Sequence, residues 1–306
     1  MTTPTENPRP DFMDLWDFRD PAATEAKFRD QLPAIRAAGD VSTLVQLLTQ
    51  IARCEGLQRR LDDAHRTLDE AHALLADADL PVARLRYLLE RGRAFDSARH
   101  APGTKQPDKA RPLYTEAFEL GRERGFHRLA LDASHMLGII EPPDLALEWN
   151  LRSIELAEQT TDDGARGWLG PLYNNTGWTH HEAGRFDAAL DMFGKSLAYR
   201  QSQNQPVEVC IAKWSVARCL RSLGRNDEAL TMQRALIDEW IEAGKEEVGY
   251  VSEELGNCLW ELGQRDEARR WFARAHERLS ANEAWLLTDE ADRMARLKRL
   301  AEGADE

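Results

Sequence analysis

One short motif recurs along the chain at a nearly constant interval, and it constrains the fold more than any other feature. An Asp-x-Ala triplet occurs at 62–64, 108–110, 144–146, 187–189, 227–229 and 266–268. A small residue precedes each triplet, and the series is Ala52, Gly92, Ser134, Gly177, Ala217 and Gly256. These small residues are spaced by 40, 42, 43, 40 and 39 positions. A period of this size is typical of stacked structural repeats rather than of a single core.

Each repeat is predicted to be a pair of helices joined by a tight turn. Gly184, Gly224 and Gly263 follow an apolar helical pattern and suit the left-handed residue that ends a helix. The aspartate of each triplet then falls in the first turn of the next helix, where a carboxylate interacts favourably with the helix dipole. No segment alternates polar and apolar residues as a strand would. The sequence therefore predicts an all-α protein.

The order of residues within a repeat resembles a known family. Gly177, Gly184, Ala189, Phe193 and Ser196 follow the order of small residue, helix-ending glycine, alanine, large apolar residue and small residue. A second repeat has the same order at Gly256, Gly263, Ala268, Phe272 and Ala275. This order resembles the tetratricopeptide repeat over about residues 41–280. The resemblance implies a right-handed α-α superhelix, a solenoid of six helical hairpins.

Some positions depart from that pattern. Asn150 and Gln233 occupy the large apolar position of their repeats, and Glu141-Pro142-Pro143 replaces the glycine turn of the third. The period also exceeds the ~34 residues of the common tetratricopeptide repeat. Longer repeats of this kind are similar to those of kinesin light chains and of bacterial peptide-sensing regulators.

The repeat predicts one continuous stack, although 306 residues alone would suggest two domains. We expect a single solenoid over 11–303, with residues 1–10 disordered and capping helices at 21–38 and 286–300. The repeats are expected at about 41–78, 80–125, 126–163, 165–204, 206–244 and 245–280. The acidic, aromatic segment 11–18 is expected to fold back onto the first helices rather than to bind a partner.

Composition excludes several classes of protein. The formal net charge of −13 argues against non-specific binding of nucleic acid. No stretch is apolar enough for a membrane span or a secretory signal, so neither a membrane nor export is expected. The four cysteines form no Cys-x-x-Cys pair, which fits a reducing compartment without structural zinc. We therefore expect a cytoplasmic protein.

In a stack of this type the first helix of each repeat lines the concave face, so residues beside the small position point into a groove. The candidate groove residues are Arg53, Arg93, Asn174, Asn175, Trp178, His181, Trp214, Arg218, Arg221, Asn257 and Trp260. Asparagine pairs with peptide amides, arginine with carboxylates, and tryptophan provides flat apolar contact. The resemblance singles out Asn174 and Asn175, because asparagines just before the small position hold the peptide backbone in light-chain-like repeats.

Two interpretations of the groove arginines remain open. Arg53, Arg93, Arg218 and Arg221 could favour an acidic peptide or a C-terminal carboxylate. Alternatively, they pair with the acidic residues of the same surface and keep the groove soluble. Those acidic residues are Glu90, Asp132 and Glu254.

Motifs for catalysis are missing from the sequence. No phosphate-binding loop, zinc-protease motif or serine-hydrolase motif occurs. Neighbouring His180 and His181 would point about 100° apart on a helix, which disfavours a shared metal. Cys54, Cys219 and Cys258 all follow the small position by two residues, which predicts a repeated core-packing site.

The sequence therefore predicts a non-catalytic adaptor without cofactor or metal, which holds an extended peptide segment of a partner protein. The alternative is a peptide-sensing regulator, and an enzyme is the least favoured class. Only about 40 residues precede the first repeat, which favours the adaptor because such regulators carry an N-terminal effector module. No feature of the sequence indicates an oligomeric state.

Overall fold

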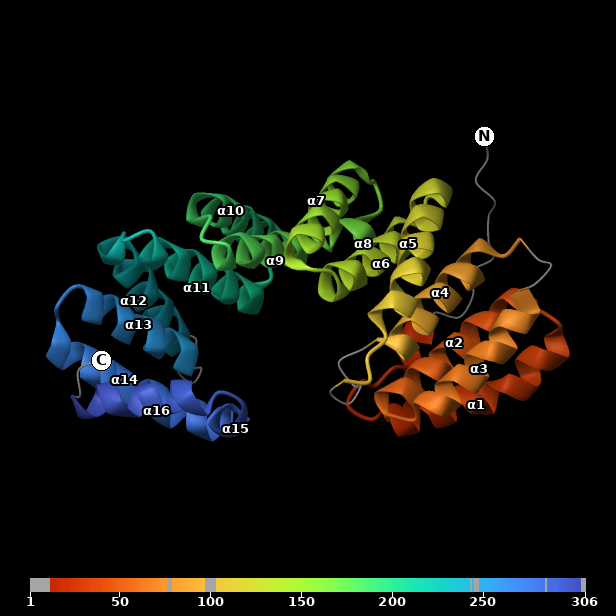
Figure 1. Ribbon diagram of the computed structural model, residues 1–306, viewed down its shortest axis with the longest axis horizontal. Coiled ribbons are helices and arrows are strands. Elements are labelled where there is room, and N and C mark those ends of the chain that lie inside the picture. Colours follow the sequence, from red (N-terminus) through yellow and green to blue (C-terminus); the bar gives the residue numbers. More distant parts are fainter. Residues whose placement is uncertain are drawn as a thin grey trace. The chain divides into compact units, whose positions relative to one another are not determined.

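The computed structural model describes residues 12–75, 79–96, 103–242, 244, 248–283 and 285–303. All regular structure in these residues is helical, so the all-α prediction is confirmed. The chain divides into two compact units, unit 1 (Met1–Trp168) and unit 2 (Leu169–Glu306), and each is described by itself (Figure 1). The predicted disorder of residues 1–10 lies outside the described residues.

Unit 1 is a stack of antiparallel helices. Its elements are η1 (Phe12–Leu15), α1 (Pro21–Ala38), α2 (Val41–Leu57), α3 (Leu61–Leu75), α4 (Pro81–Phe95), α5 (Pro107–Arg124), α6 (His127–Ile140), α7 (Pro143–Gln159) and α8 (Asp163–Arg166). Each helix from α1 to α7 packs on its neighbour in sequence, and α2, α4 and α6 also contact one another in that order. These contacts make α2, α4 and α6 one layer, which we call the inner helices of unit 1.

Unit 2 repeats the same arrangement. Its elements are α9 (Leu169–Glu182), α10 (Phe186–Ser202), α11 (Pro206–Ser222), α12 (Asn226–Glu242), α13 (Gly249–Glu261), α14 (Arg265–Asn282), α15 (Leu286–Asp289) and α16 (Ala291–Glu302). α9, α11 and α13 contact one another in that order and form the inner helices of unit 2. α16 packs on α14 and ends the stack.

Glycines form the three turns α9–α10, α11–α12 and α13–α14 of unit 2, as the repeat predicts. Gly184, Gly224 and Gly263 have φ values of 72°, 74° and 74°, in the left-handed region. An L-residue with a Cβ enters this region only with strain, so glycine is favoured at all three turns.

Close contact between an inner helix and the next helix explains the small residue of each repeat. A Cβ built on Gly177 would lie 2.5 Å from Cε1 of Phe193, and one on Gly256 would lie 2.6 Å from Cε1 of Phe272. Both phenylalanines are fully buried. The ring of the second helix therefore occupies the space that a side chain on the first would need.

Gln233 occupies the same position on α12 and is buried without a polar partner. It is fully buried, and neither its Oε1 nor its Nε2 has a hydrogen-bond partner among the described residues. A buried amide without partners destabilises a fold by about 1–3 kcal/mol. We expect Gln233→Met, which keeps the volume, to raise the free energy of unfolding by about 1–2 kcal/mol in urea titrations. The exposed Gln203→Met should change it by less than about 0.5 kcal/mol, and a loss of stability in Gln233→Met would contradict this reading.

The first helix of unit 1 and the last helices of unit 2 lie where capping helices were predicted. α1 coincides with the predicted N-terminal cap, and the segment before it folds back as expected. Phe12 is buried edge-to-face against Phe28, with ring centroids 6.0 Å apart, and Trp16 Nε1 donates to Gln50 Oε1 at 2.9 Å. The predicted C-terminal cap is divided into α15 and α16 at Glu290, which is not helical. No helix in the described residues is long and apolar enough to cross a bilayer.

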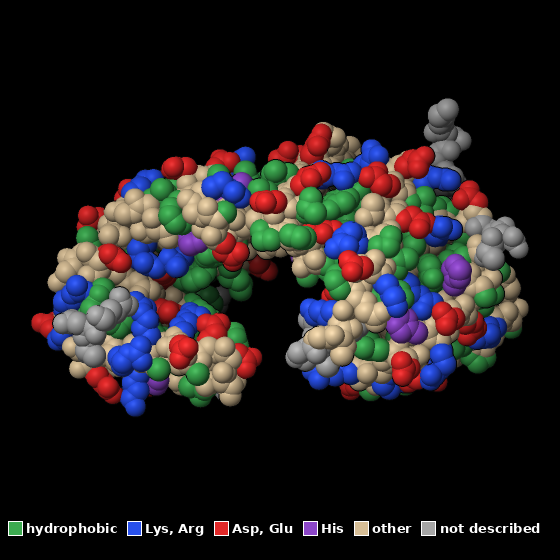
Figure 2. Space-filling view, viewed as in Figure 1, with side chains coloured by type: hydrophobic (Ala, Val, Ile, Leu, Met, Phe, Trp, Pro, Cys, Tyr) green, Lys and Arg blue, Asp and Glu red, His purple; other side chains and the backbone are tan. Residues whose placement is uncertain are grey.

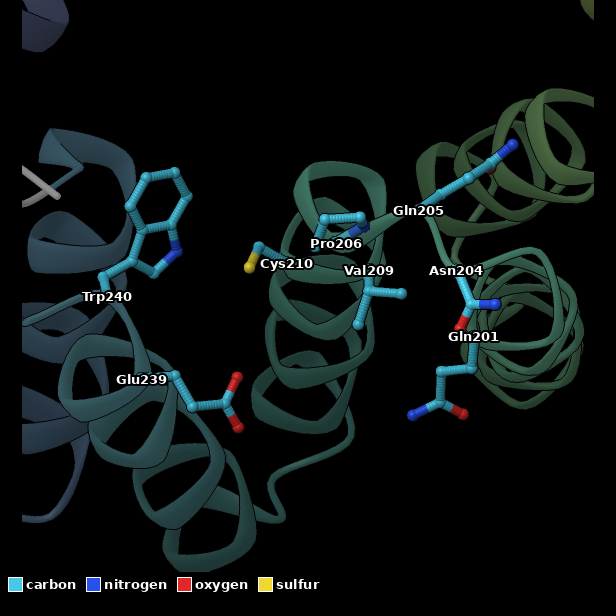
Figure 3. Close-up of a pocket in the computed structure, with 8 residues that line it drawn as sticks. All are labelled: Gln201, Asn204, Gln205, Pro206, Val209, Cys210, Glu239 and Trp240. Carbon is cyan, nitrogen blue, oxygen red and sulfur yellow. The ribbon is translucent and has the colours of Figure 1, made fainter. Parts of the chain in front are cut away.

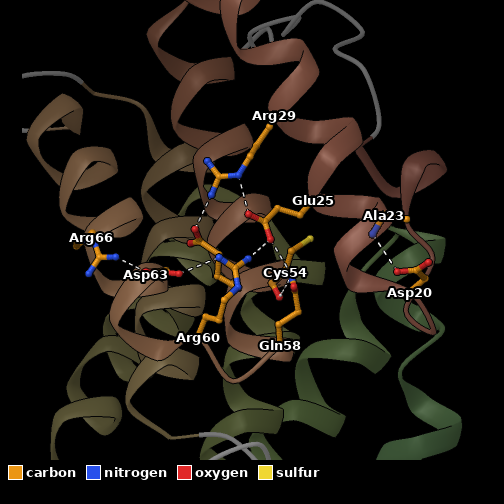
Figure 4. Close-up of polar contacts among 10 residues, drawn as sticks. Asp20, Ala23, Glu25, Arg29, Cys54, Gln58, Arg60, Asp63 and Arg66 are labelled. Carbon is orange, nitrogen blue, oxygen red and sulfur yellow. Dashed lines mark hydrogen bonds and ion pairs between the residues drawn. The ribbon is translucent and has the colours of Figure 1, made fainter.

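Buried charges join α1, α2 and the turn before α3. Arg29 donates to Glu25 Oε1 and to Glu55 Oε1, each at 2.6 Å, and Gln58 Nε2 donates to Glu25 Oε2 at 2.7 Å (Figure 4). Arg60 also contacts Glu25. Because both carboxylates are buried and paired, they tie α1 to the first hairpin.

Candidate functional site

The inner helices of unit 2 and the last helix enclose a cavity of about 460 Å³. Its lining residues come from α9 (Trp178), α11 (Trp214, Arg218, Arg221), α13 (Tyr250, Glu253, Glu254, Asn257, Trp260, Glu261) and α16 (Arg293, Arg296). On α11 the three lining residues are four and three positions apart, so they share one helix face. The repeat frame therefore places six of the eleven predicted residues at one site.

Aromatic rings form one wall of this cavity. The ring centroids of Trp178 and Trp214 are 5.7 Å apart, and those of Trp214 and Tyr250 are 6.4 Å apart. Trp214 Nε1 donates to the backbone oxygen of Tyr250 at 3.1 Å, which holds its indole in place. The Trp178 ring also packs against the buried ring of Phe193, with the ring centroids 5.0 Å apart. The wall is therefore supported from the core.

Glu254 organises the charges of the cavity. Its side chain is only 3% exposed, and it accepts from Arg221 Nε at 3.0 Å and Nη2 at 2.9 Å. Arg218 Nε lies 3.1 Å from the same carboxylate. Burial and the neighbouring Arg221 lower the pKa of the Arg218 guanidinium. One carboxylate thus serves two guanidinium groups, and a second carboxylate, that of Glu261, lies 4.0 Å from Arg221 Nη1.

α16 contributes residues that the sequence analysis did not predict. Arg293 forms ion pairs with Glu253 of α13 and with Glu290, and Arg296 also lines the cavity. The helix was expected only to cap the stack. The sequence did contain a signal for these residues. Arg293 and Arg296 are three positions apart, so they share one face of a helix that follows the last repeat.

Two of the predicted asparagines have amides without partners. The side chains of Asn175 and Asn257 are half-buried and make no hydrogen bond to other described residues, and Asn257 lines the cavity. Asn174 Oδ1 accepts from Ser215 Oγ at 3.4 Å. Half-buried amides with free donors and acceptors are available to a ligand.

His181 lies beside the cavity rather than in its lining. Its Nε2 is 2.9 Å from Ser222 Oγ, and its ring centroid is 5.2 Å from that of Trp178. Burial, followed by the charges of Arg218 and Arg221, lowers the pKa of the imidazole. The neutral form is therefore favoured near neutral pH.

Arg53 and Arg93 belong to a separate cavity in unit 1. Arg53 Nη1 donates to Glu90 Oε1 at 3.0 Å, and Arg93 donates to Glu90 Oε1 at 2.6 Å and to Asp132 Oδ1 at 2.5 Å. Together with the Glu254 pairs, these contacts match the second interpretation, in which the groove arginines pair with Glu90, Asp132 and Glu254. Acidic and basic side chains are also interspersed on the face that Figure 2 shows.

The cysteines at the repeated position are core residues, as predicted. Cys54, Cys219 and Cys258 are buried free thiols. Burial raises the pKa of Cys54 and of Cys258 to about 12, so neither is activated as a nucleophile.

A third hollow lies between the last residues of α10 and α12 and the first turn of α11. It measures about 540 Å³ and is lined by Pro206, Val209, Cys210 and Trp240, with polar side chains at its edge (Figure 3). None of the predicted groove residues lies in this hollow. Trp240 and Trp271 are half-buried against the core of unit 2, whereas Trp285 is exposed.

Comparisons with known proteins agree with the repeat. A tetratricopeptide-repeat family model matches residues 172–202, the α9–α10 hairpin. No curated protein matches the chain. The prediction of tetratricopeptide-type repeats is therefore confirmed. The count of six repeats stays a prediction, because the family model matches one hairpin.

Solved structures share the fold over most of the chain. The apo form of RapI has a TM-score of 0.74 and 11% identity, with 94% of this chain and 78% of RapI covered. A STAND signal-transduction ATPase from Pyrococcus horikoshii, described as having a tetratricopeptide repeat sensor, has a TM-score of 0.71 and 11% identity. That match covers 90% of this chain and 41% of the ATPase. At this identity the likeness is one of fold.

Proposed function

We propose that this tetratricopeptide-repeat chain is a non-catalytic binding protein that holds an extended peptide segment of a partner protein on its inner helices. The observation that carries the proposal is the cavity of unit 2. There, a supported aromatic wall faces an arginine–glutamate network, and Asn257 has a free amide. Flat apolar surface, fixed charges and free amide groups together match the needs of a peptide main chain with its side chains.

The cavity requires little rearrangement before a ligand enters. The Trp214 indole is fixed by the backbone oxygen of Tyr250, and both arginines are held by Glu254. Preorganised side chains lose less entropy on binding, so more of the contact energy appears as affinity. The guanidinium groups of Arg218 and Arg221 line the cavity and can pair with a carboxylate of the segment, as in the first interpretation of the groove arginines.

The unpartnered asparagines provide the most direct test. A partner segment is first captured from native cell extract on the full-length chain and then made as a synthetic peptide. We expect Asn257→Ala to weaken the binding of this peptide in calorimetric titrations by about 3–10-fold, because one hydrogen bond is lost. Asn175→Ala should have a similar effect, and the double variant should lose about 10–100-fold.

Neither side chain is hydrogen-bonded to another described residue, so these changes should leave the melting temperature nearly unchanged. Gln203→Ala is the matched control, because Gln203 is an exposed amide next to the end of α10. Unchanged affinity in the double variant, with the segment still bound, would show that the ligand uses another surface.

A peptide-sensing regulator is the second candidate. The Pyrococcus ATPase is described as having a tetratricopeptide repeat sensor, which supports this alternative through the shared fold. A sensor changes its shape when the peptide binds, whereas an adaptor only holds its partner. Small-angle scattering of the chain with and without the synthetic segment separates the two: a changed radius of gyration supports the sensor, and an unchanged one the adaptor.

A further inference from the structure

We propose, on the basis of the peptide-binding function above, that α11 selects partner segments in which a leucine side chain lies three positions from an acidic residue. The residues that select them share one face of α11, which we call its inner face: Val207, Ile211, Trp214, Arg218 and Arg221. These positions are four or three residues apart, so the side chains form one row along the helix. The leucine rests on the first two residues of this row, and the carboxylate pairs with Arg218.

The first half of the inner face is apolar and open to solvent. Val207 is 48% exposed and Ile211 is 53% exposed. Within the described residues, the other inner helices of unit 2, α9 and α13, expose no large hydrophobic side chain to this extent. Isolated aliphatic residues on a surface are common. These two, however, continue the aromatic wall of the cavity, because Trp214 follows on the next turn and its ring lies 6.4 Å from that of Tyr250.

The second half of the inner face is cationic, and its two arginines differ in how many partners they have. Arg221 donates to Glu254 from Nε and Nη2, and its Nη1 lies 4.0 Å from Glu261. Arg218 Nε lies 3.1 Å from Glu254 and its Nη1 donates to Ser222 Oγ at 3.2 Å, whereas its Nη2 has no partner among the described residues. The Arg218 side chain is 30% exposed. A ligand carboxylate can therefore accept from Arg218 Nη2 while Glu254 stays in place.

The separation of the two halves determines the spacing in the ligand. Ile211 and Arg218 are seven residues apart, which is about 10.5 Å along an α-helix. In a polyproline II segment, residues three positions apart point to the same side and lie about 9 Å from each other. In a β-strand, the same two residues point to opposite faces. A polyproline II segment also has no internal hydrogen bonds, so its backbone is free to pair with Asn257.

Two synthetic peptides of the same composition test this spacing. The first is acetyl-Leu-Ala-Ala-Asp-Ala-Ala-Leu-amide, and the second is acetyl-Ala-Leu-Ala-Asp-Ala-Leu-Ala-amide. Both are symmetrical about the aspartate, so the direction in which the peptide binds does not affect the spacing. Binding to the full chain is followed by NMR through the indole N–H resonance of Trp214. We expect the first peptide to bind about 3–10-fold more tightly, since only its leucines reach the aliphatic residues. Equal affinity, or no shift of the resonance with either peptide, would overturn the proposal.

Substitutions on both sides of the contact separate its two halves. Ile211→Ser should weaken the first peptide by about 3–10-fold and leave the second unchanged. The matched control is Ile241→Ser, at an isoleucine that is 59% exposed near the end of α12. Asparagine in place of the aspartate of the first peptide should weaken it by a similar factor, because a charge-assisted hydrogen bond is lost. Equal binding of the first peptide by the Ile211→Ser and Ile241→Ser proteins would contradict the proposal.

This result can be distinguished from a failure of the peptide-binding function. Equal affinity of the two peptides, with both weakened by Asn257→Ala, would rule out selection by α11 and leave the peptide-binding function standing. Failure of that function appears instead with the captured partner segment, as binding that the double variant of Asn175 and Asn257 leaves unchanged.

Discussion

Replacing Glu254 by alanine is expected to lower the free energy of unfolding by about 3–5 kcal/mol, the usual effect of removing one partner from a buried ion pair. The Glu254 carboxylate is 3% exposed and holds both Arg218 and Arg221. Without it, two guanidinium groups face each other in a partly buried site with no carboxylate between them. Urea unfolding followed by circular dichroism measures the loss.

The control for this change is another glutamate near the same arginine. Glu261 is 55% exposed and lies 4.0 Å from Arg221 Nη1, so Glu261→Ala should change stability by less than about 0.5 kcal/mol. Adding Arg218→Ala to Glu254→Ala should recover part of the loss, because one unpaired cation is then removed. If Glu254→Ala lost less than about 1 kcal/mol, Glu254 would not be the shared anchor of the two arginines.

The second large effect is expected at the small position of the matched repeat. In an exposed helix, Gly→Ala usually stabilises by about 0.5–1 kcal/mol. At Gly177, however, the added Cβ would lie 2.5 Å from the Phe193 ring, which is fully buried and cannot withdraw. Overpacking of this kind lowers the free energy of unfolding by about 1–3 kcal/mol. A Cβ this far inside the normal contact distance is expected to cause a loss near the upper end of that range. We therefore expect Gly177→Ala to destabilise by about 2 kcal/mol net, read from thermal or urea unfolding.

The same substitution on the next helix should have the opposite sign. Gly194 of α10 is exposed, and a Cβ there meets nothing within 4 Å. Gly194→Ala should therefore stabilise by about 0.5–1 kcal/mol. A smaller side chain at 193, as in Gly177→Ala with Phe193→Leu, should recover part of the loss. Stabilisation by Gly177→Ala alone would show that this glycine is not a close-packing position.

Local patterns were sufficient to predict the repeat. The turn glycines and the small positions follow from short-range rules on left-handed residues and close packing, so they can be recognised without knowledge of distant contacts. The single-solenoid interpretation stays a prediction, because the structure describes two units separately. The division of the C-terminal cap at Glu290 had no comparable local signal.

The candidate site was harder to predict, because it depends on contacts across the stack. The spacing of the repeat identified Trp178, Trp214 and Asn257 as groove residues, because a position beside the small residue determines where the side chain points. It could not determine which carboxylate each arginine pairs with, because several lie within reach. Nor could it bring Arg293 of α16 to the cavity, since that contact depends on how the last helix packs.

The central claim is that a partner segment lies against the inner helices of unit 2. A photo-crosslinking amino acid at position 257, within the cavity, tests it most directly, with position 203 at the end of α10 as the control. The account predicts that the purified partner segment is captured from position 257 and not from 203, and that an excess of unlabelled segment abolishes capture. Capture from 203 alone would contradict it.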